Sequence, residues 1–224
     1  RIISNTFDPE KLTAYELGVK GVLFDRLSID AAVFFNDWRE IVLRQLQETD
    51  PESGLPLEQP TAFNINSGDA EVFGLELAGQ LQVTDRFRAG ASLGWVDAEL
   101  KNAAQEQLRT WPTFAPDGDV SGNKLLRQPE WDASFSLSYD REFGSDWKWY
   151  ARGDATYQSS VYVGNDNQSW LPERTYVNGR LGFRSSRYTI ELWGRNLFNN
   201  DNAIAAFRDI SWANTDSLVP PYSN

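Results

Sequence analysis

Apolar and polar residues alternate along most of the chain with a period of two. From Val72 to Val83 every second residue is apolar apart from one glycine, and the residues between them are mostly glycine, alanine, glutamate or glutamine. From Trp131 to Asp140 one side reads Trp, Ala, Phe, Leu and Tyr, and the other reads Asp, Ser, Ser, Ser and Asp. This pattern is typical of strands with one apolar face. It predicts eight strands and no helix, at about 13–24, 27–46, 72–83, 87–100, 131–140, 147–160, 175–184 and 188–198.

The connections between these strands alternate in length. Short turns rich in Asp, Ser and Gly are predicted at 25–26, 84–86, 141–146 and 185–187. Long connections cover about 47–61, 101–128, 161–174 and the residues from 199 onward, with Pro, Gly, Asn and Asp throughout. The alternation favours an all-β, antiparallel up-and-down segment of an outer-membrane barrel, which has short periplasmic turns and long extracellular loops. A β-sandwich with Greek-key crossovers has no reason to keep this regular alternation of short and long connections.

Hydropathy limits how the chain could contact a membrane. Mean hydropathy is negative, and no stretch approaches the ~20 consecutive apolar residues of a membrane helix, so any contact must come from strands. Aromatic residues near the strand ends are candidates for two interfacial girdles, although each ring alone fits core packing about as well. The candidates are Tyr15, Phe34, Phe35, Trp38, Trp95, Trp131, Tyr139, Trp147, Trp149 and Tyr157.

Composition excludes several kinds of chemistry. The formal charge of -11 argues against nucleic acid as a partner. The chain has no Cys and no His, which removes disulfides, the Ser-His-Asp triad and His-ligated metals. The strings 117–119 and 165–167 carry oxygen ligands that could hold Ca²⁺, but such strings are more often turns. We therefore expect no enzyme, no catalytic residue, no cofactor and no metal site.

Several strings resemble TonB-dependent receptors and follow that family's order along the chain. Residues 8–21 (DPEKLTAYELGVKG) are similar to a recurrent strand of the family, and residues 66–77 (NSGDAEVFGLEL) are the most specific match. Residues 122–125 with Pro129, 177–182 and 194–199 (GRNLFN) resemble later segments. In this reading, Asn66, Gly68 and Gly74 serve backbone conformation and packing and do not contact a ligand. Asn196 makes hydrogen bonds at a strand end.

The resemblance implies a plug domain inside a barrel of 22 strands. The chain, residues 1–224, would be a C-terminal part of the barrel domain, roughly its fourteenth to twenty-first strands, without the plug, the TonB box, the earlier strands and the last strand. With both sheet edges open, it should not form a stable closed barrel alone.

The resemblance also implies a function for the parent protein. It would carry a scarce nutrient, by family frequency a ferric siderophore, across the outer membrane of a Gram-negative bacterium, energised by the TonB complex. Its partners would be outer-membrane lipid and lipopolysaccharide, the plug of the same chain, TonB and the small-molecule cargo. Cobalamin, haem, oligosaccharides and nickel complexes stay open as cargo. A passive porin or small structural barrel and a soluble carbohydrate-binding β-sandwich are the alternatives, and a hydrolase is disfavoured because the chain lacks His.

Two groups of site residues follow from the barrel reading. Charged residues on the polar side of the strands should face the lumen, paired with one another or with the plug: Glu16, Lys20, Glu76, Arg88, Arg152, Arg180, Glu191 and Arg195. Substrate contacts should come from the long loops, because loops on rigid scaffolds carry recognition. The alternative role for these loop residues is packing of the loops against each other. The candidates are four aromatic residues and one cation: Trp111, Phe114, Tyr162, Trp170 and Arg174.

Overall fold

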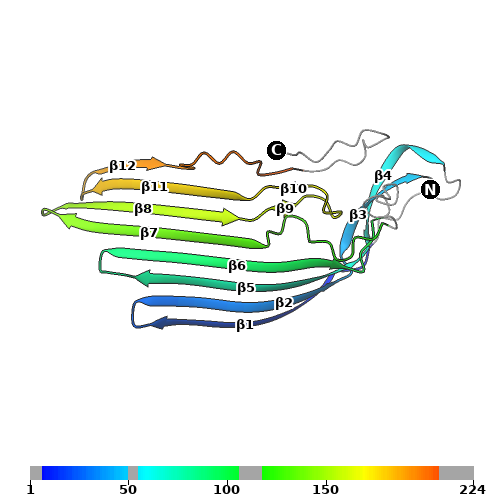
Figure 1. The fold of residues 1–224 in the computed structure, drawn as a ribbon, viewed down its shortest axis with the longest axis horizontal. Helices are drawn as coiled ribbons and strands as arrows, with labels where there is room; N and C mark the ends of the chain where they lie inside the picture. The colour runs from blue at the N-terminus through cyan, green and yellow to red at the C-terminus, as the bar shows by residue number, and fades with distance from the viewer. Residues whose placement is uncertain (1–6, 50–54, 106–117, 207–224) are drawn as a thin grey trace.

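The computed structural model describes residues 7–49, 55–105 and 118–206. These residues form one antiparallel sheet of eight strands and two small hairpins of two strands each (Figure 1). The strands are β1 (Lys11–Leu23), β2 (Leu27–Arg39), β3 (Val42–Thr49), β4 (Pro56–Asn66), β5 (Asp69–Gln82), β6 (Phe87–Lys101), β7 (Trp131–Phe143), β8 (Trp147–Gln158), β9 (Val161–Tyr162), β10 (Trp170–Leu171), β11 (Arg174–Arg184) and β12 (Thr189–Gly194).

The large sheet is a meander. Its order is β1-β2-β5-β6-β7-β8-β11-β12, so each strand pairs with the next one along the chain once the β3–β4 and β9–β10 hairpins are set aside. The all-β, antiparallel prediction is confirmed, and the order is not the Greek key expected of a sandwich. Among the described residues the sheet stays open, with β1 and β12 at its edges. No helix in this part of the chain is long and apolar enough to cross a membrane.

Short and long connections lie at opposite ends of the sheet. The four tight turns gather at one end, on the left in Figure 1, and the long loops with both small hairpins gather at the other. We call these the turn end and the loop end. Neighbouring turns are tied together, because Asp146 accepts hydrogen bonds from the backbone N–H and the hydroxyl of Ser186 at 3.2 and 3.0 Å. The predicted alternation of turn lengths is therefore confirmed.

The prediction of one strand over 27–46 is wrong. β2 ends at Arg39, and Glu40 has a φ of 59°, a left-handed conformation that turns the chain before β3 begins. Tertiary hydrogen bonds hold this turn: the Asn66 side-chain amide donates to the Glu40 carbonyl at 2.6 Å, and the Glu40 N–H donates to Asp69 at 3.1 Å. Both partners are distant in sequence, so the local pattern carries no turn signal.

Other boundaries also differ from the prediction. The expected loop 47–61 contains parts of β3 and β4, and the expected loop 161–174 contains the β9–β10 hairpin. The last predicted strand, 188–198, ends at Gly194 because Asn196 has a φ of 49°. The Asn196 side chain then exchanges two hydrogen bonds with the backbone of Asn200, at 2.8 and 2.9 Å. The strand-end role expected for Asn196 is therefore confirmed.

A buried apolar cluster lies at the loop end, where the β3–β4 hairpin and the β6–β7 connection meet the sheet. We call it the loop-end cluster; Trp38 and Leu125 pack against its buried members, which are Ile41, Leu43, Ala70, Leu100, Ala103 and Val120. Burial of these side chains stabilises the loop end, because removing apolar surface from water is favourable.

Candidate functional site

The large sheet has one continuous apolar face. Leu17, Val33, Leu75, Trp95 and Trp131 are successive partners across five strands, so their side chains share a side of the sheet. This side is largely exposed, and Leu17 keeps 74% of its surface accessible. A sheet face this apolar and this exposed marks a surface that is covered by something other than water.

Aromatic rings form a row near each end of the apolar face. At the loop end Tyr15 stacks on Phe35 with ring centroids 6.5 Å apart, and Trp95 lies 6.2 Å from Trp131. At the turn end the closest pair is Tyr139 and Trp149, at 4.9 Å. The two rows match the predicted arrangement of girdle residues.

Two of the proposed girdle rings lie elsewhere. Phe34 is the partner of Glu16 and Gly74, so its side chain is on the opposite, polar side of the sheet. Trp38 packs against the loop-end cluster. Both are therefore removed from the girdle set, because a shift of one position in a strand moves a side chain to the other face.

The second side of the sheet is polar and built largely from small residues. Gly18, Ala32, Glu76, Gly94 and Asp132 are successive partners on this polar face. The charged residues predicted to face the lumen lie on it wherever they belong to a strand. Arg195 follows β12, with its guanidinium 5.3 Å from the centre of the Trp193 ring.

Some charges on the polar face are paired and others are not. Lys20 forms an ion pair with Asp30 at 2.8 Å, and Glu191 accepts a hydrogen bond from the Tyr150 hydroxyl at 2.6 Å. Within the described residues, Glu16 and Glu76 have no ion-pair partner. These two carboxylates are available to a cation from outside this part of the chain.

The structure brings together some of the predicted substrate-contact residues. Tyr162 and Trp170 are direct partners in the β9–β10 hairpin, and Trp170 is 52% exposed. Arg174 begins β11 shortly after the hairpin. Trp111 and Phe114 lie outside the described residues. The described candidates therefore come from one segment of the loop end.

Arg174 is held in place by neutral groups. Its Nε and Nη2 donate to the Gln158 side-chain oxygen at 2.9 and 2.5 Å, and its Nη1 donates to the Ile204 carbonyl at 3.3 Å. No carboxylate of the described residues forms an ion pair with it. An arginine side chain has five N–H donors, so two remain for a ligand. The result is an oriented cation that has no ion-pair partner among the described residues.

Arg174 lines a shallow hollow of about 300 Å³ on the polar face. Its wall is mainly apolar in surface, with hydroxyls, one amide and one carboxylate among its polar groups, and these polar groups can form hydrogen bonds. The lining residues are Pro129, Asp132, Ala133, Ser134, Thr156, Tyr157, Gln158, Arg174 and Tyr176. Asp132, Gln158 and Tyr176 were not among the sequence candidates. Strand alternation places them on the polar side, but only the register shows that they adjoin Arg174.

The long loops are locked to one another. The backbone N–H of Lys124 donates to the Asn167 side-chain oxygen at 2.7 Å, and the Asn167 amide donates back to the Lys124 carbonyl at 3.1 Å. Asn123 adds a bond from its amide to the Asn165 carbonyl at 2.7 Å. Residues 122–125, one of the strings singled out in the sequence, thus bind the β8–β11 loop, and the loop end is a braced surface.

Replacing Asn167 with alanine is expected to loosen this contact. The change removes both bonds to Lys124 and places alanine at a φ of 55°, a left-handed conformation that favours glycine or asparagine. Hydrogen exchange at the Lys124 amide should become about tenfold faster, which corresponds to roughly 1.4 kcal/mol. Asn167→Asp keeps the acceptor and should retain most of the protection. Equal exchange in the alanine variant and the parent would show that other contacts hold the loop.

The two strings considered for Ca²⁺ have the hydrogen bonds of turns. Asp119 accepts from the backbone N–H of Ser121 at 2.8 Å, and contacts with the Ser121 hydroxyl and N–H keep the Asp119 pKa below its usual value. Asp166 accepts from the Gln168 N–H at 3.3 Å. Asp117 lies outside the described residues. These bonds account for the short polar strings as turns.

The chain matches known proteins over most of its length. A family model described as TonB dependent receptor-like, beta-barrel, matches residues 1–197. The ferric yersiniabactin uptake receptor FyuA from Yersinia pestis aligns with a TM-score of 0.64 at 18% identity, over 85% of this chain and 25% of its own.

Two further solved structures have the same fold. The siderophore receptor PiuA from Acinetobacter baumannii aligns with a TM-score of 0.64 at 20% identity, over 90% of this chain and 26% of its own. The copper transporter OprC aligns with a TM-score of 0.59 at 19% identity, over 88% of this chain and 26% of its own. The chain thus spans about a quarter of the length of these structures. With the family match and the open antiparallel meander, the chain belongs to the TonB-dependent receptor family, whose members are outer-membrane transporters and receptors and not enzymes.

Proposed function

We propose that the parent protein of this chain is an outer-membrane receptor of a Gram-negative bacterium that imports a ferric siderophore with energy from the TonB complex. Family membership carries the proposal. The names of FyuA and PiuA, a ferric yersiniabactin uptake receptor and a siderophore receptor, support the cargo class. OprC, a copper transporter with the same fold, shows that the fold alone does not specify the cargo.

In this proposal residues 1–224 are part of the barrel wall, and the two faces of the sheet meet different surroundings. The apolar face lies against lipid, with its aromatic rows at the interfaces, where amphipathic rings are favourable. Exposed Leu17 and Val19, at 74% and 67%, would then be covered by acyl chains. The polar face lines the lumen, and the unpaired Glu16 and Glu76 are available to cationic groups of the plug.

Cargo recognition is assigned to the loop end. Arg174 offers a fixed cation, without an ion-pair partner among the described residues, beside a hollow of about 300 Å³ that Asp132 also lines. Tyr162 and Trp170 offer neighbouring rings on the β9–β10 hairpin. Together they suit a ligand with anionic oxygens and flat aromatic or chelate surfaces, since charge-assisted hydrogen bonds and ring contacts are favourable for such groups. Ferric siderophores present both kinds of group.

Iron uptake by cells tests the proposal directly. The full-length parent is expressed in a Gram-negative strain without its own siderophore receptors and given three radioactive iron probes: a tris-catecholate, a citrate complex and a neutral trihydroxamate. We expect uptake of at least one probe, abolished when TonB is deleted. Uptake of none would reject the cargo class. Uptake that continues without TonB would indicate a passive porin.

Arg174→Gln is expected to weaken binding of an anionic probe by about tenfold, because charge-assisted hydrogen bonds contribute about 1.5–3 kcal/mol. Arg174→Lys keeps the positive charge but loses the planar guanidinium, so its Kd should lie between those of the parent and Arg174→Gln. Arg187→Gln, at the turn end, is the matched control and should bind normally. The measurement is the Kd of the purified full-length receptor for whichever probe is imported. Equal Kd values for Arg174→Gln and the parent would remove Arg174 from the site.

A further inference from the structure

A line of strand partners crosses the polar face beside the loop-end hollow and carries charges of both signs. Glu76 of β5 is the partner of Gly94 of β6, and Gly94 is the partner of Asp132 of β7. Asp132 is the partner of Gln158 of β8, which is the partner of Arg174 of β11. We call these five residues the charged line. It is acidic towards β5 and basic at β11.

Asp132 and Arg174 do not neutralise each other, although both line the same hollow of about 300 Å³. Gln158 lies between them in the line, and its side-chain oxygen holds the guanidinium, at 2.9 Å from Nε and 2.5 Å from Nη2. The Cα atoms of Asp132 and Arg174 are two strand spacings apart, or about 10 Å. Neither residue has an ion-pair partner within the described part of the chain. Opposite charges therefore face one hollow from two sides.

Gly94 accounts for the position of the Asp132 carboxylate. A Cβ added at Gly94 would have Oδ2, Cγ and Oδ1 of Asp132 as its nearest atoms. The carboxylate thus covers this buried glycine and extends towards β6, away from Arg174. Glu76 adjoins the same glycine from β5 and has no ion-pair partner among the described residues. A cation near Gly94 would therefore have a carboxylate on the strand at each side.

The polar groups in the wall of the hollow are free to bind a ligand beside Arg174. The Gln158 oxygen is used by the guanidinium, so the Gln158 amide NH₂, which donates to no described residue, can donate to a ligand oxygen. Thr156 and Tyr176 are partners in the next line of the polar face and add two hydroxyls. An anionic oxygen at Arg174 would thus receive hydrogen bonds from more than one residue.

The other charges in or next to the strands of the hollow are mostly acidic. Asp154, Glu130 and Glu173 accept hydrogen bonds from neutral donors, which are the Asn178 amide at 2.6 Å, the Trp95 indole N–H at 3.2 Å and the Tyr157 hydroxyl at 2.9 Å. Arg127 precedes the hollow in sequence, is exposed and forms no ion pair within the described ranges. Carboxylates therefore outnumber cations around Arg174.

We propose that the hollow recognises a ligand that carries a protonated amine in addition to anionic oxygens, with the amine at Asp132 and an anionic oxygen at Arg174. A ligand with anionic oxygens alone would be attracted by Arg174 and repelled by Asp132 and Glu76. An added amine turns this repulsion into attraction, because complementary charge selects between ligands. Asp132 is then a specificity-determining residue. The proposal rests on the proposed function and places amine-bearing cargo above amine-free analogues.

Triglycine tests the hollow without iron. Its amine and carboxylate are about 10 Å apart in the extended chain, which matches the separation of Asp132 and Arg174. Its matched ligands are N-acetyl-triglycine, which lacks the amine, and triglycinamide, which lacks the carboxylate. In saturation-transfer NMR titrations of the purified full-length receptor, triglycine should bind about fivefold more tightly than either. Equal binding of triglycine and N-acetyl-triglycine, or no signal from triglycine, overturns the proposal.

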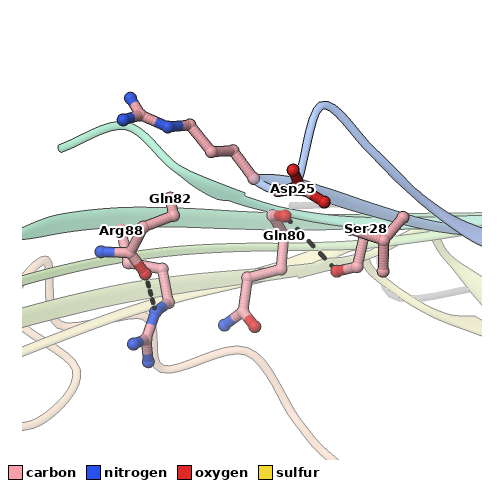
Figure 2. A pocket seen from close by; sticks show the side chains of 7 residues that line it. Asp25, Ser28, Gln80, Gln82 and Arg88 are labelled. Carbon is pink, nitrogen blue, oxygen red and sulfur yellow. Dashed lines mark hydrogen bonds between the residues drawn. The ribbon is translucent and has the colours of Figure 1, made fainter. Parts of the chain in front are cut away.

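Asp132→Asn keeps the size of the side chain and removes its charge. Binding of triglycine should weaken about fivefold, and N-acetyl-triglycine should bind at least as tightly as before. The matched control is Asp25→Asn. Asp25 lines a second hollow, of about 340 Å³ at the turn end, where Arg88 also donates to a glutamine side chain (Figure 2). Asparagine tolerates the φ of 54° at this position, so the control should fold and bind both ligands normally.

Two results with these variants contradict the assignment of Asp132. One is a preference for triglycine that persists in Asp132→Asn. The other is a preference that is lost equally in Asp25→Asn, which would show that the effect comes from overall charge and not from the loop-end hollow.

Iron complexes provide the second readout. A linear trihydroxamate with a free primary amine is compared with its N-acetyl derivative, and we expect faster uptake of the amine form by the parent and equal uptake of both forms by Asp132→Asn. If neither complex enters cells but triglycine binding depends on Asp132, the siderophore assignment fails and the assignment of Asp132 stands. If uptake requires TonB but neither uptake nor triglycine binding depends on Asp132, the siderophore assignment stands and the assignment of Asp132 fails.

Discussion

Gly68→Ala is expected to lower the free energy of unfolding of the receptor by about 2–3 kcal/mol, because added atoms in a filled space force the surroundings to move. A Cβ at Gly68 would lie 2.6 Å from the Ala103 Cβ and 2.8 Å from its Cα. Ala103 cannot easily give way. Its N–H donates to the Ser121 hydroxyl at 3.0 Å, and its carbonyl accepts from the Val120 N–H at 2.9 Å. The strain should therefore separate the β6–β7 connection from the sheet.

Urea unfolding of the refolded full-length protein measures the loss, and hydrogen exchange at the Ala103 and Ala104 amides locates it. Gly21→Ala is the matched control, because a Cβ there has nothing within 4 Å. It lies on β1 of the same sheet and should cost less than about 1 kcal/mol. If Gly68→Ala behaved like Gly21→Ala, the close approach to Ala103 would have no energetic weight.

Gly74→Ala is expected to cost about 1–3 kcal/mol for a different reason. A Cβ at Gly74 would overlap the outer end of the Phe34 ring, because Cζ, Cε1 and Cε2 of this residue on the neighbouring strand are its nearest atoms. The obstacle is a side chain and not backbone, so removing the ring should remove the penalty. In a Phe34→Ala background, Gly74→Ala should be close to neutral.

A double-mutant cycle tests this coupling. The four proteins are the parent, Gly74→Ala, Phe34→Ala and the double variant, each unfolded in urea under the same conditions. We expect a coupling energy of about 1–2 kcal/mol between the two positions. Additive effects would show that Gly74 is present for another reason, such as local backbone twist.

Prediction from sequence succeeded where one short-range rule decided the outcome. Alternation of apolar and polar residues placed Leu17 and Leu75 on one face and Glu76 on the other, because successive side chains of a strand point to opposite sides. The short turns were also recognisable, since Asp, Ser and Gly act locally there. The packing roles expected for Asn66, Gly68 and Gly74 agree with the hydrogen bonds and close approaches observed at each.

Prediction failed where the deciding partner lies far away in sequence. The break after Arg39 depends on Asn66 and Asp69, which bond to Glu40 from more than twenty positions away. The interruption of β12 likewise needs Asn178, whose side chain accepts from the Asn196 N–H at 3.0 Å. In both places a non-glycine residue adopts a positive φ. This backbone conformation is strained, and tertiary hydrogen bonds offset the strain.

The candidate site divides in the same way. The sequence identified Arg174, Tyr162 and Trp170 as candidate ligand contacts, because they fall in a predicted long loop. It did not identify Gln158 and Asp132, because only the pairing register of the strands places these two residues beside Arg174 in the hollow.

The amino-acid sequence by itself determined the fold class, the two faces of the sheet, the two kinds of strand connection and the family. These depend on local periodicity and on short strings. Only the tertiary structure decided which charges stand side by side, as Arg152 and Arg180 do, and which loops lock together, as at Lys124 and Asn167. The physical reason is that pairing between strands sets these contacts, and register is a property of two strands together and not of either one alone.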